Sequence, residues 1–128
     1  MLEKTMTPFQ NKLKKLTHEY VKYTYNIVKK FPKDETYSSV SQLKRATLSI
    51  VLNYVEGYCR RRPKVRLNFY EISYGSLGES RYLYYFALDM DWIQKEEYSQ
   101  AMVLAEEIGA MLWSEIEATE KFISIKSD

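Results

Sequence analysis

Six apolar side chains recur at intervals of four and three residues within residues 7–31, which read TPFQNKLKKLTHEYVKYTYNIVKKF. These side chains are Phe9, Leu13, Leu16, Tyr20, Tyr23 and Ile27. Residues at this spacing lie on one face of an α-helix and are typical of the seam of a helix bundle. Thr7 can cap the helix ahead of Pro8, and Pro32 disfavours helical geometry in the residue before it. The pattern therefore predicts a helix over residues 8–31.

The rest of the chain predicts three further helices, over residues 36–61, 63–90 and 95–123. The first of these carries an apolar stripe of Leu43, Thr47, Ile50 and Tyr54 and ends before Pro63. Gln94 and Glu97 have the spacing of a capping box ahead of the last helix. Only 4 Gly and 3 Pro occur in 128 residues, which favours few, long elements. Short connections force antiparallel neighbours, so we expect one domain, 1–128, folded as an all-α, up-and-down four-helix bundle.

The inner faces of the last two helices follow from the same spacing. The expected inner positions are Phe69, Ile72, Leu83, Phe86 and Met90, then Ala101, Leu104, Ile108, Met111, Ile116, Thr119 and Phe122. Gly75 and Gly78 interrupt a helical pattern, and we interpret them as a site where another backbone approaches closely. Aromatic residues surround the third helix at Tyr82, Tyr84, Tyr85 and Phe86. Some must face away from the core, either in a contact between subunits or as exposed residues that stack on bases.

Several classes of protein are disfavoured. Cys59 is the single cysteine, so neither an internal disulfide nor a zinc site is expected. The charged N-terminus and the absence of a long apolar run predict a cytoplasmic protein that does not enter a membrane. His18 is the single histidine, and no Glu-x-x-His motif of a di-iron bundle occurs. Cys59 would have only His18 as a base. We therefore expect no catalytic residues, metal or cofactor, and interpret the chain as non-enzymatic.

The charge is unevenly distributed. Residues 1–88 carry 16 Lys and Arg against 7 Asp and Glu, whereas residues 89–128 carry 3 against 10. Five cations gather in the run Arg60-Arg61-Arg62-Pro63-Lys64-Val65-Arg66, with Tyr58 and Tyr70 beside them and Lys44 and Arg45 as expected support. Guanidinium groups pair with phosphate oxygens and tyrosines stack on unpaired bases, so the run predicts a nucleic-acid site. The alternatives are a solvated loop and a contact with the acidic fourth helix of a neighbouring copy.

A polar stripe accompanies the apolar stripe on the second helix. Its members are Gln42, Ser49, Asn53 and Glu56, and the candidate partners are Ser76, Glu79 and Ser80 on the third helix, or another subunit. Glu56 and Glu79 are expected to point inward. Buried polar groups need partners. We interpret the stripe as a structural network that fixes helix register or subunit geometry, and a ligand site is the alternative.

An ordered series of motifs extends along most of the chain. It comprises Phe31-Pro32-x-x-Glu35-x-Tyr37, Gln42-Leu43-x-Arg45-Ala46-x-x-Ser49-Ile50, Asn53-x-x-Glu56-Gly57, Gly75-Ser76-Leu77-x-Glu79 and Glu107-Ile108. With this series the chain resembles the four-helix bundle proteins named for the intervening sequence of bacterial 23S rRNA genes. Ser80 departs from that pattern, since an apolar residue is usual there.

The resemblance implies a ring-shaped homopentamer of bundles. An architectural relative, the accessory variability determinant of diversity-generating retroelements, partners a reverse transcriptase and nucleic acid. Our leading hypothesis is an oligomeric protein that binds RNA, including rRNA-related RNA, or DNA through Arg60, Arg61, Arg62, Lys64 and Arg66. The alternative is a protein-binding scaffold, such as an accessory subunit of a retroelement reverse transcriptase.

Overall fold

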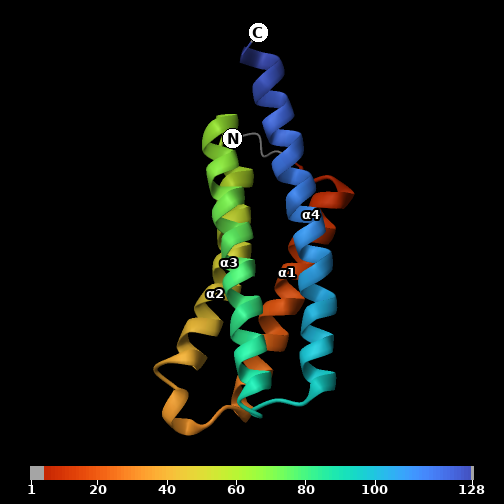
Figure 1. Ribbon diagram of the computed structural model, residues 1–128. Helices are drawn as coiled ribbons and strands as arrows, with labels where there is room; N and C mark the ends of the chain where they lie inside the picture. The colour runs from red at the N-terminus through yellow and green to blue at the C-terminus, as the bar shows by residue number, and fades with distance from the viewer. Residues whose placement is uncertain (1–4, 128) are drawn as a thin grey trace.

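Four antiparallel helices form the protein in the computed structural model, which describes residues 5–127 (Figure 1). They are α1 (Pro8–Ile27), α2 (Ser39–Cys59), α3 (Pro63–Asp89) and α4 (Lys95–Ser127). Over the described residues there is no strand, so the prediction of an all-helical, four-helix fold is confirmed. None of these helices is both long and apolar enough to cross a lipid bilayer, judged over the same residues.

The helix ends follow local chemistry. Thr7 and Gln10 form a complete capping box at the start of α1, where each side chain bonds the backbone N–H of the other. After α1 come two short 3-10 helices, Val28–Lys30 and Lys33–Glu35. α2 begins at Ser39, three residues later than predicted, because Glu35 accepts hydrogen bonds from the hydroxyls of Ser38 and Ser39 and holds a turn ahead of the helix. α4 continues to Ser127, beyond the predicted end at residue 123.

The inner stripes of α1, α2 and α4 lie mostly where the spacing predicted. In α1 the buried seam consists of Leu13, Thr17, Tyr20, Thr24 and Ile27. Phe9 and Phe122, expected inside, are 41% and 43% exposed, and both lie near the ends of their helices. The expected stripe of α2 is fully buried.

α3 buries a different face from the one predicted. Ile72 and Met90, expected inside, are exposed. Leu83 is buried as predicted, and the other buried side chains are Tyr70, Ser73, Leu77, Ser80, Tyr84 and Ala87. This face contains serines and tyrosines, which hydropathy does not identify as interior, because their polar atoms find partners only once the other helices are in place.

Hydroxyl pairs connect the helices across the middle of the bundle. The hydroxyls of Tyr20 and Ser80 lie 2.9 Å apart, and those of Thr24 and Tyr84 lie 2.6 Å apart, so two bonds join α1 to α3. Ser73 donates to the carbonyl of Ile50 in α2 at 2.6 Å. Among the described residues no buried side-chain nitrogen or oxygen lacks a partner. Buried tyrosines are therefore accommodated in the core because their hydroxyls form hydrogen bonds with side chains of other helices.

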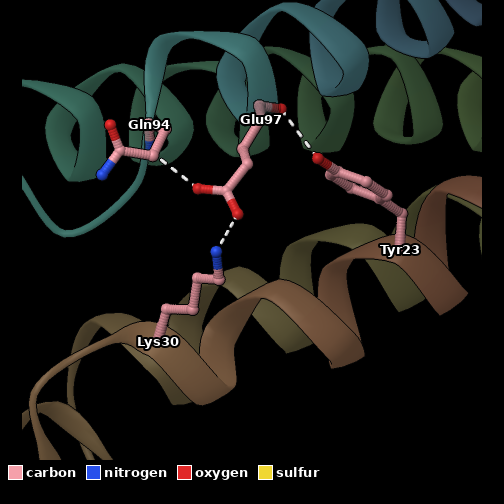
Figure 2. Close-up of polar contacts among 4 residues, drawn as sticks. All are labelled: Tyr23, Lys30, Gln94 and Glu97. Carbon is pink, nitrogen blue, oxygen red and sulfur yellow. Dashed lines mark hydrogen bonds and ion pairs between the residues drawn. The ribbon is translucent and has the colours of Figure 1, made fainter.

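The loop between α3 and α4 is fixed by a polar junction on Glu97 (Figure 2). The Glu97 carboxylate accepts the backbone N–H of Gln94 at 2.7 Å and pairs with the ammonium group of Lys30. The backbone carbonyl of Glu97 accepts the hydroxyl of Tyr23 at 2.9 Å. One residue thus caps the start of α4 and attaches it to the end of α1.

Glycine serves close packing at a different place from the one predicted. A methyl group at Gly75 or Gly78 would meet nothing within 4 Å, so no backbone of the same chain approaches them. A methyl group at Gly57 would lie 2.9 Å from the ring of Tyr70 and 3.1 Å from the carbonyl of Arg66. The close approach is therefore between the end of α2 and the start of α3.

Candidate nucleic-acid interface

The arginine corner, defined here as Arg60, Arg61, Arg62, Lys64 and Arg66, forms the sharp connection between α2 and α3. α2 ends at Cys59, and Arg60 has extended backbone geometry. Pro63 occupies the first turn of α3, where its missing N–H costs no hydrogen bond. Because only three residues separate the two helices, the cations stay close together at one end of the bundle (Figure 1).

Arg60 is anchored to the fold. Its guanidinium group lies 2.6 Å from the carboxylate of Glu56 and 5.3 Å from the ring centre of Phe69. Its backbone carbonyl accepts a long hydrogen bond of 3.4 Å from Arg66. Arg60 therefore shapes the corner and has its charge partly offset.

Arg61, Arg62 and Lys64 are exposed cations. In the described part of the chain none of the three forms an ion pair. With Arg60 and Val65, the two arginines line a shallow recess of about 260 Å³. Unpaired guanidinium groups in an exposed recess can take phosphate oxygens without first breaking an internal bond.

The tyrosines beside the corner cannot stack on bases, which corrects the prediction. Tyr58 is 8% exposed and Tyr70 is 2% exposed. The ring of Tyr70 stacks against Tyr54 at 5.3 Å in the space that Gly57 leaves open. The corner therefore presents charge for phosphates and little aromatic surface for bases.

Lys44 and Arg45 lie far from the corner they were expected to support. Sixteen residues of helix separate Lys44 from Arg60, which corresponds to about 24 Å along the axis of α2. The ammonium group of Lys44 lies 4.8 Å from the ring centre of Tyr25 in α1. Arg45 donates to the hydroxyl of Ser41 at 2.8 Å. These two cations belong to the other half of the molecule.

The polar stripe forms only in part. The hydroxyls of Ser49 and Ser76 lie 2.7 Å apart, and Asn53 donates to the hydroxyl and carbonyl of Ser49 at 2.9 Å. Glu56 does not point inward, because it turns toward Arg60 at the helix end and its side chain is 44% exposed. Such an exposed pair contributes roughly 0.3–0.5 kcal/mol to stability.

The remaining two members of the predicted stripe lie outside that network. Gln42 and Glu79 are exposed and line a recess of about 270 Å³ with Arg45, Ala46 and Ser49. Glu79 therefore does not point inward either, because α3 turns its serines rather than this carboxylate toward the core. Ser49, Asn53 and Ser76 join α2 to α3, while Gln42 and Glu79 face solvent.

A second basic feature was not predicted. An open groove of about 1030 Å³ follows the end of α1 and the segment that leads into α2. We call it the lysine groove, and its basic members are Lys22, Lys29, Lys33 and Lys44. They come from several elements, so no contiguous basic run marks them. The seven-residue spacing of Lys22 and Lys29, which places both on one face of a helix, is the signal that could have found them.

The two residues considered for nucleophilic catalysis, Cys59 and His18, both lie at the surface. Cys59 is an exposed thiol beside the arginine corner, and His18 is exposed on α1. Within residues 5–127 there is no cluster of three or more His, Cys, Asp or Glu side chains that could hold a metal ion.

Comparison with protein families identifies the chain. The model of the 23S rRNA-intervening sequence protein family matches residues 10–114. The chain belongs to this family. The match includes α2 and α3 completely and most of α1, and therefore all of the arginine corner. The resemblance inferred from the ordered motifs is confirmed.

A solved structure shares the fold of this family member. It is a protein of unknown function from the S23 ribosomal protein family of Bacteroides thetaiotaomicron, with a TM-score of 0.75 and 21% sequence identity. The similarity covers 81% of this chain and 97% of the other. No curated protein sequence matches the chain.

Proposed function

We propose that this 23S rRNA-intervening sequence protein is a non-enzymatic, oligomeric bundle that binds nucleic acid through the arginine corner. The observation that carries the proposal is a set of three exposed cations, Arg61, Arg62 and Lys64. None of them forms an ion pair with another described residue, and the short connection between α2 and α3 holds them close together. Nucleic-acid phosphates are the ligands that such groups bind best. RNA and DNA both offer them.

The arginine corner is tested by a salt titration of RNA and DNA binding. The variant Arg61→Ala/Arg62→Ala removes two exposed charges and leaves the Arg60 anchor in place. For single strands, the log-log salt slope should fall by about 0.7 for each phosphate that the variant no longer binds. The control Lys14→Ala/Lys15→Ala removes the same charge from the exposed surface of α1 and should keep the slope. An unchanged slope in the arginine variant, or no binding by wild type, would favour the protein-scaffold function instead.

The oligomeric part of the proposal rests on the outer face of α3. Gly75 and Gly78 leave the backbone of α3 uncovered by side chains, and an added methyl group at either position meets nothing within 4 Å. Ile72, Tyr82 and Tyr85 flank the two glycines and are 44%, 62% and 53% exposed. Aromatic side chains around small residues suit a close contact with a helix of another copy. We infer that copies meet here, and family resemblance makes a ring-shaped homopentamer the expected assembly.

Replacing both glycines tests this interface. Gly75→Ala/Gly78→Ala should stabilise the isolated chain by up to about 1 kcal/mol for each residue, because alanine has the higher helix propensity and meets no neighbour. The same methyl groups should obstruct the contact between copies and lower the mass measured by light scattering. A monomeric wild type, or a variant with unchanged mass, would contradict this interface.

A further inference from the structure

We propose that the lysine groove is a second nucleic-acid site, which takes a segment of a single strand with phosphates on the lysines and a base against Tyr25. This inference rests on the proposed function for the class of ligand, but it concerns a different part of the molecule. The groove lies at the end of the bundle opposite the arginine corner (Figure 1).

The charge of the groove is available to a ligand. Lys22, Lys29 and Lys33 are exposed, and across the described residues none of them forms an ion pair. Their neighbour Lys30 is excluded from this set because Glu97 pairs with it (Figure 2). The single acidic lining residue is Glu19. The groove therefore holds unpaired ammonium groups near one another, which favours an anionic ligand.

The lining also contains a surface suited to a planar ring. Val28, Phe31 and Val40 are buried members of the apolar part of the lining. Tyr25 is 39% exposed, and the ammonium group of Lys44 lies 4.8 Å from its ring centre. Proteins that bind single strands combine a basic groove with aromatic side chains on which bases stack.

An acidic helix of a second copy is the competing ligand, because α4 carries 7 Glu against 3 Lys. Its carboxylates would match the lysines, and its Trp113 is 50% exposed, so charge and ring surface alone do not distinguish the two ligands. Asn26 and Thr36, which are exposed in the lining, can bond the polar edges of a base. A nucleotide unit matches the charge, the ring surface and the polar groups together.

The two basic sites are electrostatically independent. The separation of about 24 Å between Lys44 and Arg60 exceeds twice the Debye length of about 8 Å at physiological salt. Loss of one site should therefore leave the salt dependence of the other intact. Strands that reach both sites should bind more tightly than strands confined to one.

The decisive experiment measures binding of oligo(U) and oligo(dT) at several salt concentrations to full-length protein. Lys29→Ala/Lys33→Ala should reduce the log-log salt slope by about 0.7 for each phosphate that these lysines bind in wild type. Lys14→Ala/Lys15→Ala removes the same charge from the exposed surface of α1, outside the lining of both basic sites, and should not change the slope. Tyr25→Ala should weaken binding by about fivefold or more, whereas Tyr25→Phe should retain it. Circular dichroism verifies that each variant is folded.

Chemical footprinting gives a readout at the groove itself. Bound oligo(U) should protect Lys29 and Lys33 from an amine-acetylating reagent, as measured by mass spectrometry, in wild type and in Arg61→Ala/Arg62→Ala. Loss of strand binding in that arginine variant with no effect of the groove variant would contradict this inference and leave the proposed function standing. A groove variant that changes the oligomer mass but not strand binding would show that the groove holds a neighbouring copy. Protection by AMP alone at a similar concentration would assign the groove to free nucleotides.

Discussion

Gly57 has no side chain, and this absence allows α2 and α3 to approach closely at the arginine corner. The Tyr70 ring lies where a side chain at position 57 would be, and it stacks against Tyr54 behind it. The ring is 2% exposed, so it has little freedom to move aside. The carbonyl of Arg66 limits the space from the backbone side.

We expect Gly57→Ala to destabilise the protein by about 1–3 kcal/mol, the usual result of adding a methyl group to a packed site. Helix propensity alone would favour alanine, so the sign of the effect tests the contact. Chemical denaturation of the monomeric chain measures it. Gly75→Ala adds the same group where it meets nothing and should show no loss of stability. Equal effects from both substitutions would disprove the close approach.

Single residues also show how site residues could be predicted. The arginines of the corner are consecutive, so their proximity is evident before any fold is known. The direction of Glu56 was not evident, because position 56 lies near the helix end, where the side chain can turn toward Arg60 instead of the core. Spacing specifies a face of a helix, whereas the nearest opposite charge determines where a long side chain ends.

At the scale of elements, the junction on Glu97 holds the start of α4 against the end of α1 (Figure 2). The backbone N–H of Gln94, followed by the ammonium group of Lys30, lowers the pKa of the Glu97 carboxyl below its ordinary value. Because the pKa is lowered in the folded state, the stabilisation is present above the ordinary carboxyl pKa. It is lost as the pH falls through the lowered value.

We therefore expect Glu97→Gln to lower the melting temperature at neutral pH, since glutamine can still accept the Gln94 N–H but carries no charge for Lys30. The difference between wild type and variant should shrink as the pH falls through the lowered pKa of Glu97, where the wild-type carboxylate becomes protonated. Melting curves of both proteins over a pH series measure it. A difference that stays constant down to acidic pH would show that the charge is not what matters.

The helices differed in how far the sequence could predict them. α1 and α2 have alternating apolar and polar faces, so spacing identified most of their buried residues. α3 buries Ser73 and Ser80 and exposes Ile72, the reverse of what hydropathy favours. The reason is tertiary, because the hydroxyls bond to Ile50 and Tyr20 of other helices, and those bonds cannot be read from α3 alone.

On the scale of the whole molecule, the buried tyrosines connect stability to alkaline pH. Burial raises the pKa of Tyr20, Tyr54, Tyr70 and Tyr84 well above the ordinary value of about 10. Tyr54 also donates its hydroxyl to the Glu115 carboxylate at 2.5 Å, which further disfavours the phenolate. A raised pKa stabilises the fold below the ordinary value and ceases to do so as the pH rises through the folded-state value.

We expect two phases in an alkaline titration. The first phase is a rise in tyrosinate absorbance with the helices intact. The buried tyrosines should ionise only together with loss of helix, because each phenolate is unfavourable inside the core. Tyrosinate absorbance and circular dichroism, followed on the same samples, measure the two phases. Ionisation of all 12 tyrosines without loss of helix would contradict the buried hydroxyl pairs.

The whole molecule also explains why the lysine groove was missed. Its cations come from α1, the short 3-10 helices that follow it and α2, and they become neighbours only when the first two helices pack. The arginine corner needs no such assembly because its cations are adjacent in the chain. Prediction from sequence therefore favoured the site that is local in the chain over the site that the fold creates.

The hydroxyl pair of Tyr20 and Ser80 has a consequence for how the chain can evolve. Loss of the Ser80 hydroxyl alone would leave the buried Tyr20 hydroxyl without its partner. Loss of the Tyr20 hydroxyl alone would leave Ser80 with only its hydrogen bond to the Leu77 carbonyl in the same helix. We therefore expect substitutions at positions 20 and 80 to be coupled, so that a family member with an apolar residue at position 80 carries phenylalanine at position 20. Such paired substitution would record the contact between α1 and α3 in the genealogy of the family.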